Sequence, residues 1–153
     1  MNPGALIDSN VVVAAVADTH EHHVASLAVL NASDDGALAV ADHSYAEAYV
    51  VLTRRGVRAA FEFTAQEAWA ALESMRAVTT LVGLTANQTF DSLRDYARIG
   101  GVSVRLYDKL IGETAVVHAI PTIVTWNARH MQSLFPRLKV ATPPAFMSSI
   151  PAS

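Results

Sequence analysis

The sequence contains no cysteine, and only 16% of its residues are charged. Without cysteine the chain can form neither a disulfide framework nor a thiolate metal site, so nothing in it requires an oxidising compartment. Its apolar runs are much shorter than the roughly 20 residues that a membrane-spanning helix needs, and the N-terminus "MNPGALID" has no basic signal region. We therefore expect a cytoplasmic protein without a membrane segment.

The composition favours one folded domain with a sizeable core. The chain has 153 residues, of which 52% are hydrophobic. The net charge of −3 does not indicate nucleic-acid binding, but nine of the 11 basic residues are arginine, the better bidentate ligand for phosphate. The low share of charged residues also leaves apolar surface for a partner or a second copy to cover.

Short apolar runs alternate with helical patterns along the chain. The runs are typical of buried parallel strands, and they lie at 5–8, 37–41, 78–82, 121–125 and 138–142. Between them, helices are predicted at 19–32, 43–56, 64–76, 85–101 and 105–119. Expected caps are Asp18, with Glu21 three residues on, and the pairs Ser44–Glu47 and Thr64–Glu67. This alternation predicts an α/β fold, a parallel sheet of four or five strands covered on both faces. We expect one domain over 1–142 and a loosely held tail over 143–153.

Polar side chains stand where the predicted strands end. Asp8 closes the first strand, and Asn127 follows the strand at 121–125. Glu47 lies in the first turn of one helix and Asp108 near the start of another. Because ligands bind at the carboxyl ends of parallel strands, these side chains are expected to converge at one edge of the sheet.

Each of these residues also has a local structural explanation. Asp8 could cap the turn that follows it, and Glu47 could be the capping-box partner of Ser44. Asp108 could stabilise the positive end of its helix, and Asn127 is a natural N-cap for "ARHMQSLF". Local sequence alone leaves these alternatives open.

Four motifs, in order and spacing, resemble a known family: "LIDSN", "SYAEAYVVLTR", "GGVSVRLYDKLIGETAVVHA" and "IPTIVTWNARHM". They are similar to the PIN domain, and specifically to the VapC-like toxins of type II toxin–antitoxin pairs. The resemblance implies a three-layer α/β/α sandwich and an endoribonuclease that depends on Mg²⁺ or Mn²⁺. It also implies a homodimer held inactive by a cognate VapB-like antitoxin. The implied carboxylate cluster is Asp8, Glu47 and Asp108, with Asn127 where many relatives carry a fourth acid.

The chemistry of such a cluster agrees with the resemblance. Mg²⁺ prefers octahedral oxygen coordination, and a divalent ion removes the repulsion between clustered carboxylates. Asn10 and Thr125 are candidates for orienting the ligands. Glu113 is a possible acid at the rim of the site. For contacts to RNA phosphates, the candidates are Arg54, Arg98 and Arg129.

Two other functions fit parts of the pattern. A catalytically degenerate PIN fold would bind RNA or a protein without cutting it, as Asn127 and the negative net charge suggest. A phosphotransfer enzyme would use Asp8 as its nucleophile, but Asn10 stands where such enzymes carry a second aspartate. The sequence leaves open which RNA is cut and whether one or two ions bind.

Overall fold

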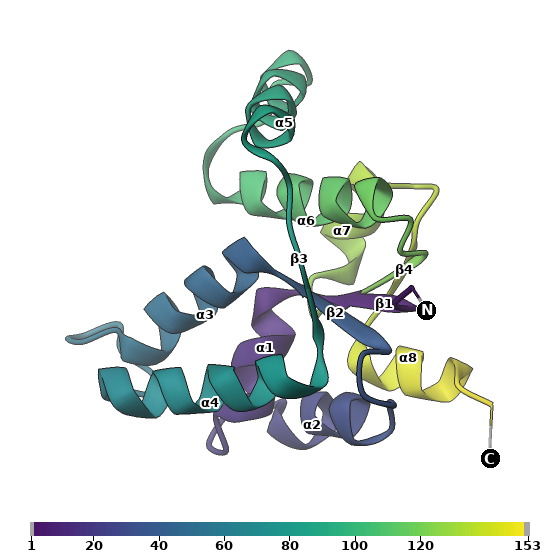
Figure 1. Cartoon of the computed structure of the whole chain (residues 1–153). Helices are drawn as coiled ribbons and strands as arrows, with labels where there is room; N and C mark the ends of the chain where they lie inside the picture. The colour runs from purple at the N-terminus through teal and green to yellow at the C-terminus, as the bar shows by residue number, and fades with distance from the viewer. Residues whose placement is uncertain (1, 152–153) are drawn as a thin grey trace.

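The computed structural model describes residues 2–151 and contains a five-stranded sheet in the order β3-β2-β1-β4-β5 (Figure 1). Every pairing is parallel. The α/β fold with a parallel sheet is therefore confirmed, and each predicted strand overlaps an observed one. The strands are β1 (Ala5–Ile7), β2 (Leu38–Ala41), β3 (Thr80–Val82), β4 (Thr122–Val124) and β5 (Lys139–Ala141).

Helices cover both faces of the sheet, which makes three layers (Figure 1). They are α1 (Ser9–Val16), α2 (His23–Asn31), α3 (Asp42–Thr53), α4 (Ala65–Val78), α5 (Ala86–Arg98), α6 (Leu106–Val117), α7 (Ala128–Leu134) and α8 (Pro143–Ser149), with a 3₁₀ turn at Ser103–Arg105. None of these helices, in the part of the chain that the structure describes, is long and apolar enough to cross a membrane.

Alternate residues of the central strand β1 supply two separate cores. Ile7 belongs to the core that packs against α1, α3 and α4, whereas Leu6 belongs to the core formed with α6 and α7. In the register of the sheet, Leu6 lies opposite Ala39 of β2 and Ile123 of β4. Burial on both faces explains why the strands are continuous apolar runs without alternation.

Two of the expected helix caps differ from the structure. The capping box of Thr64 and Glu67 is present at the start of α4. Asp18, however, caps nothing, because the chain turns before α2, which begins only at His23. The pair of Ser44 and Glu47 forms no capping box either, because α3 already begins at Asp42 and places Ser44 inside its first turn.

The C-terminal segment is more ordered than we expected. In place of a loosely held tail, Pro143–Ser149 form helix α8, whose Thr142 N-cap accepts a hydrogen bond from the N–H of Ala145. Phe146 and Met147 pack against the core that contains Ile7. Thr followed by Pro is a favourable helix start, and two apolar side chains hold the helix to the domain. Residues 152–153 of the expected tail lie outside the described residues.

Candidate active site

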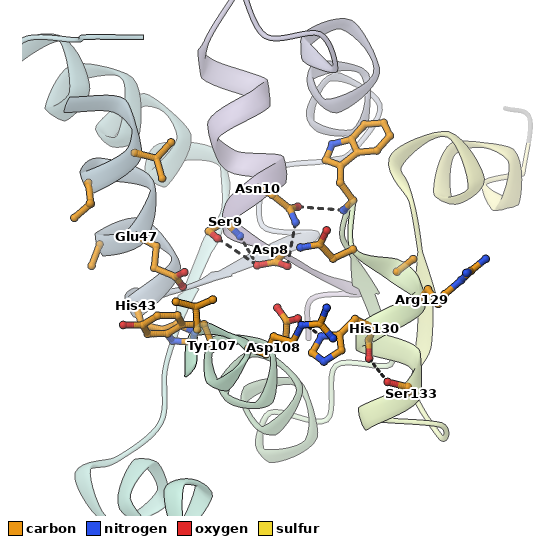
Figure 2. Close-up of a pocket in the computed structure, with 18 of the residues that line it drawn as sticks. Asp8, Ser9, Asn10, His43, Glu47, Tyr107, Asp108, Arg129, His130 and Ser133 are labelled. Carbon is orange, nitrogen blue, oxygen red and sulfur yellow. Dashed lines mark hydrogen bonds and ion pairs between the residues drawn. The ribbon is translucent and has the colours of Figure 1, made fainter. Parts of the chain in front are cut away.

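A pocket of about 1120 Å³ opens at the carboxyl ends of β1 and β4. Asp8, Glu47, Asp108 and Asn127 all line it, and Figure 2 shows the first three pointing into it from separate elements. The structure therefore brings together the four residues that were expected to converge at one edge of the sheet. It does so across more than 100 positions of sequence.

Asp8 is the most buried of the carboxylates, with 4% of the residue exposed. One oxygen, Oδ1, accepts a hydrogen bond from the backbone N–H of Ser9 at 2.7 Å, so Asp8 does cap α1. The other oxygen, Oδ2, accepts from the hydroxyl of Thr125 at 2.8 Å and, more weakly, from the Asn10 amide at 3.4 Å. Capping and facing the pocket are thus compatible roles for one side chain.

Thr125 and Asn10 form a small network that holds Asp8. Besides donating to Asp8, the Thr125 hydroxyl accepts from the Asn10 amide and from the backbone N–H of Asn127, both at 3.1 Å. Its single donor and two acceptor positions are therefore all used. The Asn10 carbonyl oxygen accepts from the backbone N–H of Trp126 at 3.1 Å, so both ends of this amide are occupied. Asn10 and Thr125 lie where groups that orient Asp8 should lie.

The carboxyls of Asp8 and Glu47 are harder to ionise than usual. Burial raises the pKa of Asp8 from 3.8 to about 6; the Thr125 hydrogen bond opposes this rise and the charge of Asp108 adds to it. Burial, followed by the charges of Asp8 and Asp108, raises the pKa of Glu47 from 4.5 to about 7. Desolvation and mutual repulsion are the costs that a divalent cation would remove.

Glu47 differs from Asp8 because its Oε1 atom is buried and has no hydrogen-bond partner. The capping-box explanation for Glu47 fails, since Ser44 is also buried and its hydroxyl likewise lacks a partner. A buried unpaired carboxylate oxygen costs several kcal/mol unless a ligand satisfies it. Glu47 thus keeps one carboxylate oxygen unsatisfied at the lining of the pocket.

Asp108 lies in the first turn of α6, in keeping with its expected effect on the helix dipole, and its Oδ2 contacts Nδ1 of His130. His130 comes from the first turn of α7 and also lines the pocket. Sequence reasoning did not select it. The only available signal was its place three residues after Asn127 in the helix that follows β4.

Asn127 occupies the N-cap position of α7, but its side chain makes no capping hydrogen bond. The residue is exposed at the rim of the pocket. Asn127 therefore lies at the predicted N-cap position of its helix, whereas the expected capping hydrogen bond of its side chain is absent.

The structure shows which of the arginine and glutamate residues predicted at the rim line the pocket and which lie elsewhere. Arg54 and Arg129 line the pocket, together with Arg105, which the sequence analysis did not select. Arg98 does not; it lies at the end of α5, where it pairs with Asp95 at 3.9 Å. Glu113 is also outside the lining, and its carboxylate binds the Lys109 ammonium group on the same helix.

The donor set suits a hard divalent cation. Within residues 2–151 no three His, Asp or Glu side chains are gathered tightly enough to form a ready-made ion site. The unpartnered Oε1 of Glu47 and the raised pKa values of Asp8 and Glu47 nevertheless fit a cation that would be held by carboxylate oxygens. Asp8, Glu47 and Asp108 are the residues that would hold it.

Comparisons with solved structures find toxins of toxin–antitoxin systems. Mycobacterium tuberculosis VapC20, described as a sarcin-ricin loop cleaving toxin, superposes with a TM-score of 0.66 at 12% identity, over 84% of this chain and 94% of that one. VapBC from Salmonella typhimurium, bound to DNA, gives 0.62 at 16% identity over 94% and 99% of the two chains. FitAcB from Neisseria gonorrhoeae gives 0.59 at 15% identity over 91% and 97%.

These identities are low, so the likeness shows the fold alone. No curated protein matches the sequence. A model of the PIN domain, by contrast, matches residues 5–133, which include Asp8, Glu47, Asp108 and Asn127. That match spans most of the chain and covers β1 through α7. On this evidence the chain belongs to the PIN domain family.

Proposed function

We propose that the chain is a Mg²⁺- or Mn²⁺-dependent endoribonuclease of the VapC type, acting as the toxin of a cytoplasmic toxin–antitoxin pair. One observation carries the proposal. Asp8, which is buried, and Glu47, which is partly buried, have raised pKa values and share a pocket with Asp108, and one Glu47 oxygen has no partner. Such an arrangement is costly for stability and is typical of a site that binds a cation.

Each residue of the pocket has a role in this proposal. A bound ion would supply an activated water at neutral pH and neutralise charge on the phosphate. Asp8, Glu47 and Asp108 hold the ion, and Thr125 keeps the Asp8 carboxylate aimed at it. Arg54 and Arg129 hold RNA phosphates at the rim, and Arg105 joins them. Arg98, which lies away from the pocket lining, would contact only a longer RNA.

The proposal is tested with the purified full-length chain and a mixture of cellular RNAs. We expect cleavage with Mg²⁺ or Mn²⁺ and none with a chelator. Asp8→Asn and Asp108→Asn should each lower the rate at least about 100-fold, because a lost ligand costs no less than a lost supporting group. The matched control is Asp91→Asn, an exposed carboxylate on α5 that pairs with Arg94. Its rate should equal that of the wild type.

A catalytically degenerate PIN fold is the second candidate, and the exposed Asn127 favours it. This residue stands at the pocket rim, at the position where the family resemblance implies a fourth acid. If the wild type binds RNA and metal but cuts no RNA at any metal concentration, this second function replaces the first. The phosphotransfer alternative has less support, because both ends of Asn10 are hydrogen-bonded and this residue supplies no acid.

The proposed partners are a VapB-like antitoxin and a second copy of the chain. VapBC2 from Rickettsia felis was crystallised on a promoter DNA fragment, so this kind of complex occurs among the structural relatives. An apolar pocket of about 560 Å³ between α3, α4 and β3, lined by Tyr49, Trp69 and Leu81, supports burial against a second protein surface. Analytical ultracentrifugation of the chain alone should give a dimer, and Trp69→Asp should shift it toward monomer.

A further inference from the structure

His43 is a polar side chain at the pocket for which the proposed function has no use. It lies in the first turn of α3, lines the pocket, and leaves 22% of its side chain exposed. Its Nε2 atom is buried and has no hydrogen-bond partner. A buried ring nitrogen without a partner costs free energy and needs an explanation.

The position of His43 on its helix relates it to Glu47. The two residues are four apart on α3, so they share one face of the helix. Each carries a buried polar atom without a partner, Nε2 on His43 and Oε1 on Glu47. Two donor side chains four residues apart on a helix are a common way to present ligands to one metal ion.

The other ring nitrogen indicates which atom is free to bind. Nδ1 lies 3.8 Å from the Asp42 carboxylate, which also accepts the backbone N–H of His43 at 2.8 Å. A carboxylate facing Nδ1 favours the proton on that nitrogen and leaves the lone pair on Nε2. Histidines that bind metals typically donate their second N–H to a carboxylate, and Asp42 is the carboxylate next to Nδ1, although at 3.8 Å it makes no direct hydrogen bond.

We propose that His43 binds the divalent ion of this pocket through Nε2, beside Glu47, and that Asp42 positions its ring. The inference rests on the proposed function, because it concerns a ligand of the same ion. Its consequence is selectivity. An imidazole ligand favours Mn²⁺ and the later transition ions over Mg²⁺, which prefers oxygen. The site would therefore hold Mn²⁺ more tightly than a purely carboxylate cluster would.

Pulsed electron paramagnetic resonance of Mn²⁺ bound to the full-length chain tests this assignment without RNA. The wild type should show coupling between Mn²⁺ and a histidine nitrogen, and labelling histidine with ¹⁵N should change the coupling. His43→Gln should abolish it. The matched control is His130→Gln, because His130 lines the same pocket but contacts Asp108 through Nδ1. That variant should retain the coupling.

Calorimetry adds a second measurement on the same proteins. His43→Gln should weaken Mn²⁺ binding about tenfold and leave Mg²⁺ binding within about twofold of wild type. Asp42 is exposed, and Asp42→Asn leaves His43 in place. This variant should retain the nitrogen coupling and weaken Mn²⁺ binding by a smaller factor than His43→Gln does. Circular dichroism establishes that each variant is folded.

The outcomes separate this inference from the proposed function. If Mn²⁺ binds the wild type without nitrogen coupling, or if the coupling is lost in His130→Gln and kept in His43→Gln, the assignment of His43 is wrong and the carboxylate site stands. Unchanged Mn²⁺ affinity in a folded His43→Gln also contradicts it. If neither Mn²⁺ nor Mg²⁺ binds the wild type, the proposed function fails, and the role of His43 fails with it.

Discussion

Buried polar groups are hydrogen-bonded on one side of the pocket and have unpaired atoms on the other. On the β4 side, Asp8 and Thr125 satisfy each other within a network that also includes Asn10. On the α3 side, His43, Ser44 and Glu47 each have a buried polar atom with no partner. The polar side chains near β4 are therefore held in place by hydrogen bonds, whereas those on α3 have polar atoms without hydrogen-bond partners. Under the proposed function, the unpaired atoms of His43 and Glu47 are the ones that a bound ion would satisfy.

The largest expected effect comes from breaking the network on the β4 side. Thr125→Val removes one donor to Asp8 and the acceptor of two N–H groups, from Asn10 and Asn127. At about 1–3 kcal/mol for each buried group left unpaired, and with incomplete additivity, we expect about 4 kcal/mol lower free energy of unfolding. Urea denaturation with a chelator present measures it.

A second buried threonine provides the control for this substitution. Thr114 donates only to the Leu110 carbonyl within α6, so Thr114→Val should cost about 1 kcal/mol or less. Thr125→Ser, which keeps the hydroxyl, should recover most of the stability. An equal loss for both valine variants would show that the network around Asp8 is not special.

The next effect concerns pH and has a definite sign. Because the folded-state pKa of Asp8 is raised from 3.8 to about 6, the folded chain binds this proton more tightly than the unfolded chain does. The resulting stability is complete below pH 4 and is lost as pH rises through 6, and Glu47 acts in the same direction up to about pH 7. Between pH 4.5 and 7.5, metal-free wild type should lose about 2 kcal/mol relative to Asp8→Asn.

Adding a divalent ion should reverse this loss. A cation bound by ionised carboxylates stabilises the folded state most at the high end of the pH range, where the metal-free protein is least stable. Thermal unfolding with and without Mn²⁺ at the two pH values measures the reversal. A difference between wild type and Asp8→Asn that is independent of pH would contradict the raised pKa of Asp8.

A smaller and opposite effect is expected on the α3 side. The Ser44 hydroxyl is fully buried without a partner, so Ser44→Ala removes an unpaired polar group and adds a better helix former. We expect about 1 kcal/mol higher free energy of unfolding by urea denaturation. The contrast with Thr125→Val is direct, since both substitutions delete a buried hydroxyl. A loss of stability would mean that Ser44 has a bonding partner in solution.

The sequence predicted one side of the pocket better than the other. Asp8 and Asn127 were placed by a rule about strand ends, which depends only on recognising short apolar runs such as 5–8 and 121–125. Thr125 was selected for a different reason, its place two residues before Asn127. What it could not predict is the bond from Thr125 to Asp8, which joins residues 117 positions apart.

The α3 side was harder to predict because burial is a tertiary property. Local sequence favoured a capping box between Ser44 and Glu47, and only the observed start of α3 at Asp42 excludes it. His43 was not selected at all, because nothing in the local sequence shows that its ring nitrogen is buried without a partner. The same limitation affected Pro143–Ser149, where the helix start was visible in the sequence but the packing of Phe146 was not.

The smallest expected effect sharpens the comparison at the rim, where Asn127 lies next to the β4 side. Asn127→Asp adds one negative charge at nearly constant volume, and the side chain makes no capping bond that the change could break. Stability should therefore hardly change. The added charge should lower the Mg²⁺ or Mn²⁺ concentration for half-maximal cleavage by about three- to tenfold, the size expected for one charge acting on a divalent ion at an exposed position.

The control for Asn127→Asp is Asn87→Asp, which adds the same charge to the exposed first turn of α5, away from the pocket lining. It should leave the metal midpoint unchanged. Because Asn127 is exposed, its effect should also shrink as ionic strength rises. Calorimetry then counts the ions: a second ion in Asn127→Asp would show that charge alone limits the wild type to one. If the midpoint and the ion count both stay the same, Asn127 lies too far from the ion to act on it, and Asp8, Glu47 and Asp108 carry the acidic charge of the site.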